Sequence, residues 1–258
     1  MEVVICANYD EMSKQAAQVV ADLVRAKPDA VLGFATGTSP IGLYKELARM
    51  HKAEGLDFSE VTTFNLDEYA GLDGTHPQSY RRFMNENLFN HINVPKENTN
   101  VPSGTAADWR EFCDEYEEMI IDAGGIDLQV LGIGSDGHVA FNEPGSSLGS
   151  ATRLVYLTKQ TLDDNSRFFD RPEDVPRTAI SMGVGTILEA HQCLMVVNGA
   201  NKAAALAAAV EGPVTSMITA SALQWHPDTI VFCDEPAAAG LKMRDYYDWI
   251  QKQKAAGE

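Results

Sequence analysis

The sequence predicts an α/β fold, with one domain built on a mostly parallel β-sheet that helices flank. Short apolar runs rich in Val, Ile, Leu and Phe alternate with segments of helical period along the chain, which is the pattern of repeated strand–helix units. Most runs have the character of strands buried on both faces. No internal repeat or long linker divides the 258 residues, so one domain over 1–258 is the simplest organisation.

The apolar runs and the helical segments can be placed in order along the chain. The expected strands are residues 3–6, 31–35, 61–65, 128–133, 154–157, 179–182, 193–198 and 230–233. Helices are expected at 12–24, 41–48, 80–88 and 109–120, where apolar side chains recur three or four positions apart. The Ala-rich stretch 199–212 is expected to be a helix whose small side chains allow close packing on the sheet. We expect these apolar stripes, such as the one that ends at Met119 and Ile120, to be core.

Residues 158–177 form a polar stretch that contains the aromatic pair Phe168 and Phe169. Such a segment suits a mobile lid over an active site. An ordinary surface helix is an equally supported alternative.

Composition and charge exclude several classes of protein. Thirty-seven acidic against 20 basic side chains give a net charge of −17, the wrong sign for binding nucleic acid or anionic membranes. The chain has no run of about 18 apolar residues and no basic N-terminal leader pattern, which favours a cytoplasmic location. The four cysteines are far apart and form no CxxC pair, so we expect buried thiols in a reducing compartment.

A first candidate site follows the strand expected at 31–35. Thr36, Gly37, Thr38 and Ser39 form a turn rich in glycine and hydroxyls that leads into a helix, with Ser39 expected as N-cap and Pro40 as the first helical residue. Free N–H groups and the helix dipole at such a turn suit a phosphate. The turn lacks both common nucleotide-binding patterns, so a nucleotide cofactor is not expected. A plain helix cap is the alternative.

Two carboxylates end the next strand, in the segment FNLDEY at residues 64–69. Ligands of open α/β sheets bind outside the carboxyl ends of the strands, so acids there are candidates for proton transfer. Because adjacent side chains usually point in different directions, we expect one of the two, Asp67, to face the site. Helix capping is the alternative for Asp67.

The segment GIGSDGHVAFNEP, residues 132–144, is the most informative. Its glycines, Gly137 among them, can let the backbone approach a ligand. Asp136, His138 and Glu143 follow within eight residues, and a carboxylate beside one imidazole nitrogen leaves the other nitrogen free to move a proton. The spacing would also allow a metal, but an acid/base apparatus without metal is the favoured interpretation.

Two cations stand in unusual places. Arg167 lies in the expected lid, and Lys202 lies at the expected start of a helix directly after a strand. A cation at a helix N-terminus is unfavourable unless an anion is bound there. Both are therefore candidates for ligand binding, with a solvated surface position as the alternative.

Together these motifs resemble the glucosamine-6-phosphate deaminase family, and the similarity covers nearly the whole chain. FNLDEY, GIGSDGHVAFNEP, NSRFF, ALAAAVEG and QWHPDTIVFCDEP occur in the family's order. The resemblance implies a Rossmann-like α/β domain that converts glucosamine 6-phosphate and water into fructose 6-phosphate and ammonia. It implies neither metal nor nucleotide.

The resemblance also implies roles for individual residues. His138, held by Asp136 and Glu143, would assist opening of the pyranose ring. Asp67 would be the base that takes the proton from C2 and returns it to C1. The turn 36–39, with Arg167 and Lys202, would hold the phosphate.

Departures from the family pattern concern the phosphate turn and the response to an effector. The turn reads Thr-Gly-Thr-Ser-Pro, where the family more often has Thr-Gly-Gly-Thr-Pro or Thr-Gly-Ser-Thr-Pro, so hydroxyls are kept. Arg153 matches allosteric members, but Val155 and Tyr156 replace a basic residue and a threonine. Activation by N-acetylglucosamine 6-phosphate is therefore not expected, and a homo-oligomer remains open.

Two alternatives compete with the deaminase. A 6-phosphogluconolactonase is similar in fold and in the G-x-G-x-D-G-H run, but it lacks the Asn-Glu-Pro continuation and needs no base like Asp67. A sugar-phosphate sensor domain of a transcription regulator would keep the phosphate turn and lose the base.

Overall fold

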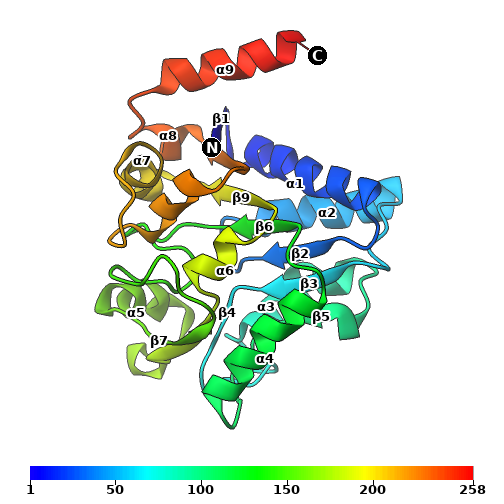
Figure 1. Ribbon diagram of the computed structural model, residues 1–258, viewed down its shortest axis with the longest axis vertical. Coiled ribbons are helices and arrows are strands. Elements are labelled where there is room, and N and C mark those ends of the chain that lie inside the picture. The colour runs from blue at the N-terminus through cyan, green and yellow to red at the C-terminus, as the bar shows by residue number, and fades with distance from the viewer. Residues whose placement is uncertain (258) are drawn as a thin grey trace.

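Seven parallel strands form the central sheet of the computed structural model, which describes residues 1–257 (Figure 1). In spatial order they are β1 (Glu2–Cys6), β10 (Thr229–Asp234), β9 (Gln192–Val197), β6 (Leu128–Leu131), β2 (Val31–Phe34), β3 (Thr62–Asn65) and β5 (Thr99–Asn100). Every neighbouring pair is parallel. The mostly parallel α/β fold predicted from the sequence is therefore confirmed.

Helices cover both faces of this sheet. α1 (Tyr9–Ala26), α2 (Ile41–Glu54) and α3 (Tyr80–Asn87) share one hydrophobic cluster with the sheet, and α4 (Trp109–Asp122), α6 (Val184–Leu188) and α7 (Ala203–Glu211) share another. Short 3₁₀ helices span Phe89–His91, Lys96–Asn98, Ser166–Phe168, Pro172–Asp174, Ala200–Lys202 and Thr219–Trp225. Along β9, Cys193 and Met195 enter one cluster while Leu194 and Val196 enter the other. Burial on both faces explains the continuous apolar runs.

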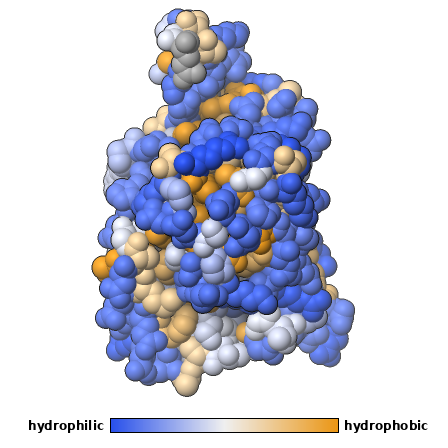
Figure 2. Space-filling view, turned by 90° about the vertical axis from the view of Figure 1, so that its right-hand side faces the viewer, coloured by the Kyte–Doolittle hydropathy of each residue, from blue (hydrophilic) through white to orange (hydrophobic). Residues whose placement is uncertain are grey.

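Two helices end the chain. α8 (Glu235–Ala238) begins after β10, with the carboxylate of Asp234 accepting a hydrogen bond from its backbone. α9 (Arg244–Gly257) contacts β1 and projects from one end of the molecule (Figures 1 and 2). Its Tyr246 and Trp249 are more than half exposed.

A second, antiparallel sheet of three strands lies beside the main one. Its order is β4 (Asp67–Tyr69), β8 (Thr178–Ser181) and β7 (Arg153–Tyr156). Two of the apolar runs expected from the sequence, 154–157 and 179–182, belong here and not to the parallel sheet. The expected lid segment, 158–177, connects β7 to β8 and contains α5 (Lys159–Asn165).

Some local predictions were wrong. α2 begins at Ile41, and Ser39 does not cap it, because the Ser39 hydroxyl bonds to Asn198 instead. The helix expected from residue 199 starts with a 3₁₀ turn at Ala200–Lys202, and α7 follows. Met119 is 42% exposed although it shares the stripe of α4.

Among residues 1–257 no helix combines the length and apolar character that crossing a membrane requires.

Candidate active site

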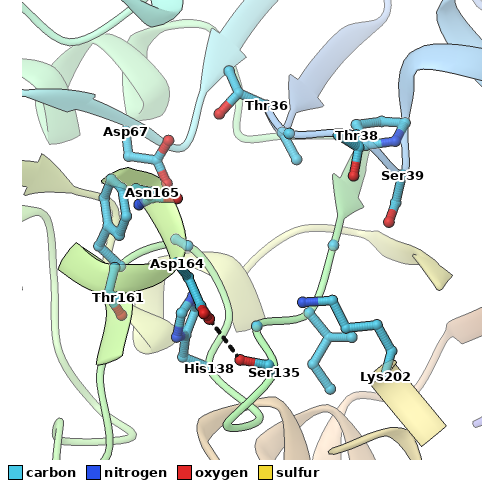
Figure 3. A pocket seen from close by; sticks show the side chains of 18 of the residues that line it. Thr36, Thr38, Ser39, Asp67, Ser135, His138, Thr161, Asp164, Asn165 and Lys202 are labelled. Atoms are coloured by element: carbon cyan, nitrogen blue, oxygen red, sulfur yellow. Dashed lines mark hydrogen bonds between the residues drawn. The ribbon is translucent and has the colours of Figure 1, made fainter. Parts of the chain in front are cut away.

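A cavity of about 800 Å³ opens at the carboxyl ends of four adjacent strands, β9, β6, β2 and β3. The loops after these strands line the cavity together with α5 and the following turn. In Figure 3 Asn165 of α5 lies on the same side as Asp67, across from Ser39. Of the side chains predicted as site residues, those that line it are Thr36, Thr38, Ser39, Asp67, His138, Arg167 and Lys202. Segments separated by more than 160 residues thus meet at one place.

The turn after β2 presents hydroxyl groups to this cavity. Gly37 has a φ of 99°, a left-handed conformation that a side chain would strain, so the glycine makes the tight turn possible. The Ser39 hydroxyl donates a 2.7 Å hydrogen bond to Oδ1 of Asn198, in the loop after β9. This bond joins two of the loops that border the cavity.

The loop after β9 carries Lys202 toward the same space (Figure 3). Gly199 at its start has a φ of 90°, and its N–H donates to both oxygens of Asp234 at the end of β10. Burial lowers the pKa of Lys202, and the negative charges of Asp164 and Asp136 oppose that shift. The ammonium group is thus partly desolvated, which strengthens its attraction for an anion.

Asp67 faces the cavity while Glu68 faces the protein. Asp67 is 6% exposed, and burial, assisted by the charge of Glu68, raises the pKa of Asp67 to about 7. The carboxylate of Glu68 accepts hydrogen bonds from the Ser79 hydroxyl and from the N–H groups of Tyr80 and Arg81, at the start of α3. The two adjacent carboxylates therefore differ in surroundings, one holding a helix end and one left at the cavity wall.

His138 lies against two carboxylates. Its Nδ1 is 2.7 Å from Oδ1 of Asp136 and 3.6 Å from Oε2 of Glu143. Burial alone would lower the pKa of His138, but the two carboxylates outweigh burial and raise the pKa to about 9. The backbone N–H and the hydroxyl of Thr158 donate hydrogen bonds to Glu143 and fix that carboxylate. With Nδ1 engaged, Nε2 is the nitrogen left for a ligand.

The glycines of this loop differ in their surroundings, since Gly132 and Gly134 line the cavity and Gly137 does not. A Cβ on Gly134 would lie 2.4 Å from the His138 ring, so Gly134 makes room for the imidazole. Gly137 does not line the cavity; its N–H donates to the Gly134 carbonyl and its own carbonyl accepts from Ala220. Ala140, at the cavity wall, is the one non-glycine residue of the described chain with positive φ, 49°.

The expected lid segment lies over the site. Thr161, Asp164, Asn165 and Arg167 all line the cavity. The Ser135 hydroxyl, three residues before His138, donates a 2.8 Å hydrogen bond to Asp164 (Figure 3). The segment is thereby tied to the loop that carries the imidazole.

Asp136, His138 and Glu143 are also the described group whose ligand atoms could surround a metal ion. The 2.7 Å separation of His138 Nδ1 and Asp136 Oδ1 argues against that use. Two ligands of one zinc ion, each at about 2.0–2.2 Å in tetrahedral geometry, would lie about 3.4 Å apart. The spacing instead fits a carboxylate that accepts the proton of an imidazole nitrogen.

Several cavity residues were not singled out from the sequence. Asn198 and Asn201 follow β9, and Asp164 and Asn165 precede Arg167 in the expected lid. The position of Asn198 at the carboxyl end of an apolar run was a usable signal. Tyr80 and Phe141 carried no such signal, because an aromatic side chain occurs in a hydrophobic core as readily as at a cavity wall.

These features define a class of protein, an α/β enzyme in which acid/base groups and cations share one polar cavity. Residues 7–232 match the sequence model of a protein family described as "Glucosamine-6-phosphate isomerases/6-phosphogluconolactonase". The chain is a member of that family.

Named relatives agree over almost the full length. Glucosamine-6-phosphate deaminase of Halothermothrix orenii is 52% identical over 241 residues, which are 93% of this chain and 100% of the relative. The deaminase of Alkaliphilus oremlandii is 53% identical over 234 residues, 91% of this chain and 97% of the relative.

Solved structures extend the comparison. One described as a monomeric glucosamine-6-phosphate deaminase has a TM-score of 0.91 at 43% identity, covering 93% of this chain and 100% of that one. The 6-phosphogluconolactonase of Trypanosoma brucei has a TM-score of 0.74 at 17% identity, covering 93% and 98%. The second likeness concerns the fold alone.

Proposed function

We propose that this protein is a glucosamine-6-phosphate deaminase, which converts glucosamine 6-phosphate and water into fructose 6-phosphate and ammonia. The observation that carries the proposal is one cavity bordered by Asp67, His138 and Lys202. It supplies a base, an acid and a cation for an anionic substrate. Relatives about 50% identical over nearly the whole chain carry the deaminase name.

Ring opening is assigned to His138. A pKa raised to about 9 keeps its imidazole protonated near neutral pH. Nε2 can therefore donate a proton to the ring oxygen as the C1–O bond breaks, while the C1 hydroxyl releases its proton to water and becomes the aldehyde. Asp136 and Glu143 stabilise the imidazolium by their charges, and they hold the ring with Nε2 toward the cavity.

Proton transfer between C2 and C1 is assigned to Asp67. With a pKa near 7, its carboxylate is a stronger base than an ordinary aspartate and is still ionised in part at neutral pH. It takes the C2 proton of the open-chain sugar as the C1 carbonyl oxygen gains a proton, which gives an enolamine. It then returns its proton to C1 as the amino group gives one up, which leaves an imine at C2. Water adds to that imine, and ammonia leaves to give the ketone of fructose 6-phosphate.

The phosphate is assigned to the turn 36–39 together with Arg167 and Lys202. The hydroxyl-bearing residues of this turn line the same cavity as the two cations. Binding energy from this remote group can orient the sugar for the proton transfers. Positioned acid/base groups typically contribute about 10²- to 10⁴-fold each.

The decisive experiment incubates the purified, chelator-treated protein with glucosamine 6-phosphate. We expect ammonia and fructose 6-phosphate in equal amounts. Hydrolysis of 6-phosphogluconolactone without deamination would replace the proposal by the lactonase alternative. Binding of the sugar phosphate without turnover of either compound would favour the sensor alternative.

A cytoplasmic location is part of the proposal. The cysteines Cys6, Cys113, Cys193 and Cys233 are buried and unbridged within residues 1–257, which suits a reducing compartment. Sedimentation of the purified protein would decide whether it forms a homo-oligomer.

A further inference from the structure

We propose that Tyr9 is a positioning residue for the phosphate turn, acting through its hydroxyl group on the backbone of that turn. Tyr9 does not line the cavity, and it comes from α1, an element outside the four loops that border the site. The inference rests on the proposed function because it assigns the turn 36–39 to phosphate.

The Tyr9 hydroxyl bridges two parts of the chain. It donates a 3.2 Å hydrogen bond to the carbonyl oxygen of Thr38 and accepts a 2.7 Å bond from the N–H of Gly42. Thr38 lies in the turn, and Gly42 is the second residue of α2. One oxygen atom therefore links the turn to the helix that follows it.

This bridge replaces a missing helix cap. Pro40 precedes α2 and its side chain makes no capping hydrogen bond, while the Ser39 hydroxyl bonds to Asn198 across the cavity. A helix N-terminus leaves N–H groups without partners inside the helix. The Tyr9 oxygen satisfies the one on Gly42, so Ser39 stays turned toward the cavity and is not drawn back onto the helix.

The surroundings fix the Tyr9 ring in place. A Cβ on Gly42 would lie 2.9 Å from Cε1 of Tyr9 and 2.1 Å from the Ser13 hydroxyl, so the starts of α1 and α2 approach as closely as glycine allows. Asn8 caps α1 by accepting a 2.9 Å bond from the N–H of Glu11. A capped helix start and a close helix contact thus hold the hydroxyl at the turn.

Loss of the hydroxyl should loosen the turn without emptying the space that the ring fills. Each neutral hydrogen bond contributes about 0.5–1.5 kcal/mol, roughly a 2- to 10-fold effect on an equilibrium. We therefore expect Tyr9→Phe to raise the KM for glucosamine 6-phosphate about 3- to 10-fold while kcat changes less than about 2-fold. Because Asp67 and His138 sit on other loops, the proton transfers should be spared.

The test compares Tyr9→Phe with Tyr246→Phe, a control on the exposed face of α9. Steady-state kinetics give KM and kcat, and calorimetry gives the affinity for inorganic phosphate. We expect Tyr9→Phe alone to weaken phosphate by the same factor as it raises KM. A fall in kcat with KM unchanged, or a phosphate affinity equal to that of the unaltered protein, would overturn the proposal.

Phosphate binding separates this inference from the proposed function. If the unaltered protein binds phosphate but does not deaminate the sugar, the deaminase assignment fails, and the calorimetric comparison still decides the role of Tyr9. If the unaltered protein binds no phosphate, the turn has no such ligand to be positioned for, and the inference fails with it.

Discussion

Replacing the proposed base should make the protein more stable above neutral pH. Burial raises the pKa of Asp67 from 3.8 to about 7, so folding opposes ionisation of this carboxyl group. Below pH 3.8 the group is neutral in both states and costs nothing. The cost grows as the pH rises from 3.8 and is complete above the folded-state pKa. Asp67→Asn removes the charge and with it the cost.

The size of the effect follows from the shift. About three pKa units at 1.36 kcal/mol each correspond to at most about 4 kcal/mol. Water entering the open cavity solvates part of the charge, so we expect a gain of about 1–3 kcal/mol at pH 8.5. For a chain of this length that gain corresponds to a rise in Tm of about 2–10 °C.

Thermal unfolding of both proteins between about pH 5.5 and 8.5 tests this reasoning. The Tm difference in favour of Asp67→Asn should widen with rising pH, and turnover should be lost. Asp163→Asn is the control, because Asp163 is an exposed carboxylate paired with Lys159 on α5. An Asp67→Asn protein no more stable than its parent at the higher pH would refute the account of Asp67 as a desolvated base.

Three further predictions concern activity. In the unaltered protein, kcat/KM should fall below about pH 7, where the proposed base is protonated, and above about pH 9, where His138 loses its proton. Asp136→Asn should move the alkaline limb of this profile to lower pH. An unmoved limb would contradict the proposal that Asp136 raises the pKa of a catalytic His138. Arg167→Ala should raise the KM for glucosamine 6-phosphate about 10-fold or more, and an equal loss toward unphosphorylated glucosamine would argue against a phosphate contact. Asp164→Asn removes a negative charge that acts on Lys202 and should tighten inorganic phosphate about 2- to 5-fold, measured by calorimetry; weaker binding would show that Asp164 supports the anion site.

The parallel sheet and the position of the cavity were predictable because both follow from local pattern. Apolar runs mark buried strands wherever they occur, and the carboxyl ends of parallel strands lie at one edge. Polar residues directly after those runs, such as Thr36 and Lys202, therefore had to come near one another. Their exact partners did not follow from this rule.

The three-stranded sheet was beyond such reasoning. β4 has three residues and pairs with β8, which begins 109 positions after β4 ends, while β8 pairs in turn with β7. No local pattern marks a pairing between segments so far apart. The same holds for Ser39, which matches the preference for an N-cap but bonds to Asn198, more than 150 residues away. Long-range contacts overruled the local preference in both cases.

The hydrogen bond between Asp164 and Ser135 joins the expected lid to the loop that carries His138. A sugar that entered or left by lifting α5 would therefore pull on that loop. Substitutions in this loop are then expected to alter substrate access and proton delivery by the proposed acid together. A more viscous solvent slows conformational movement but not bond breaking. The dependence of kcat on solvent viscosity would therefore show how much of each turnover such movement takes.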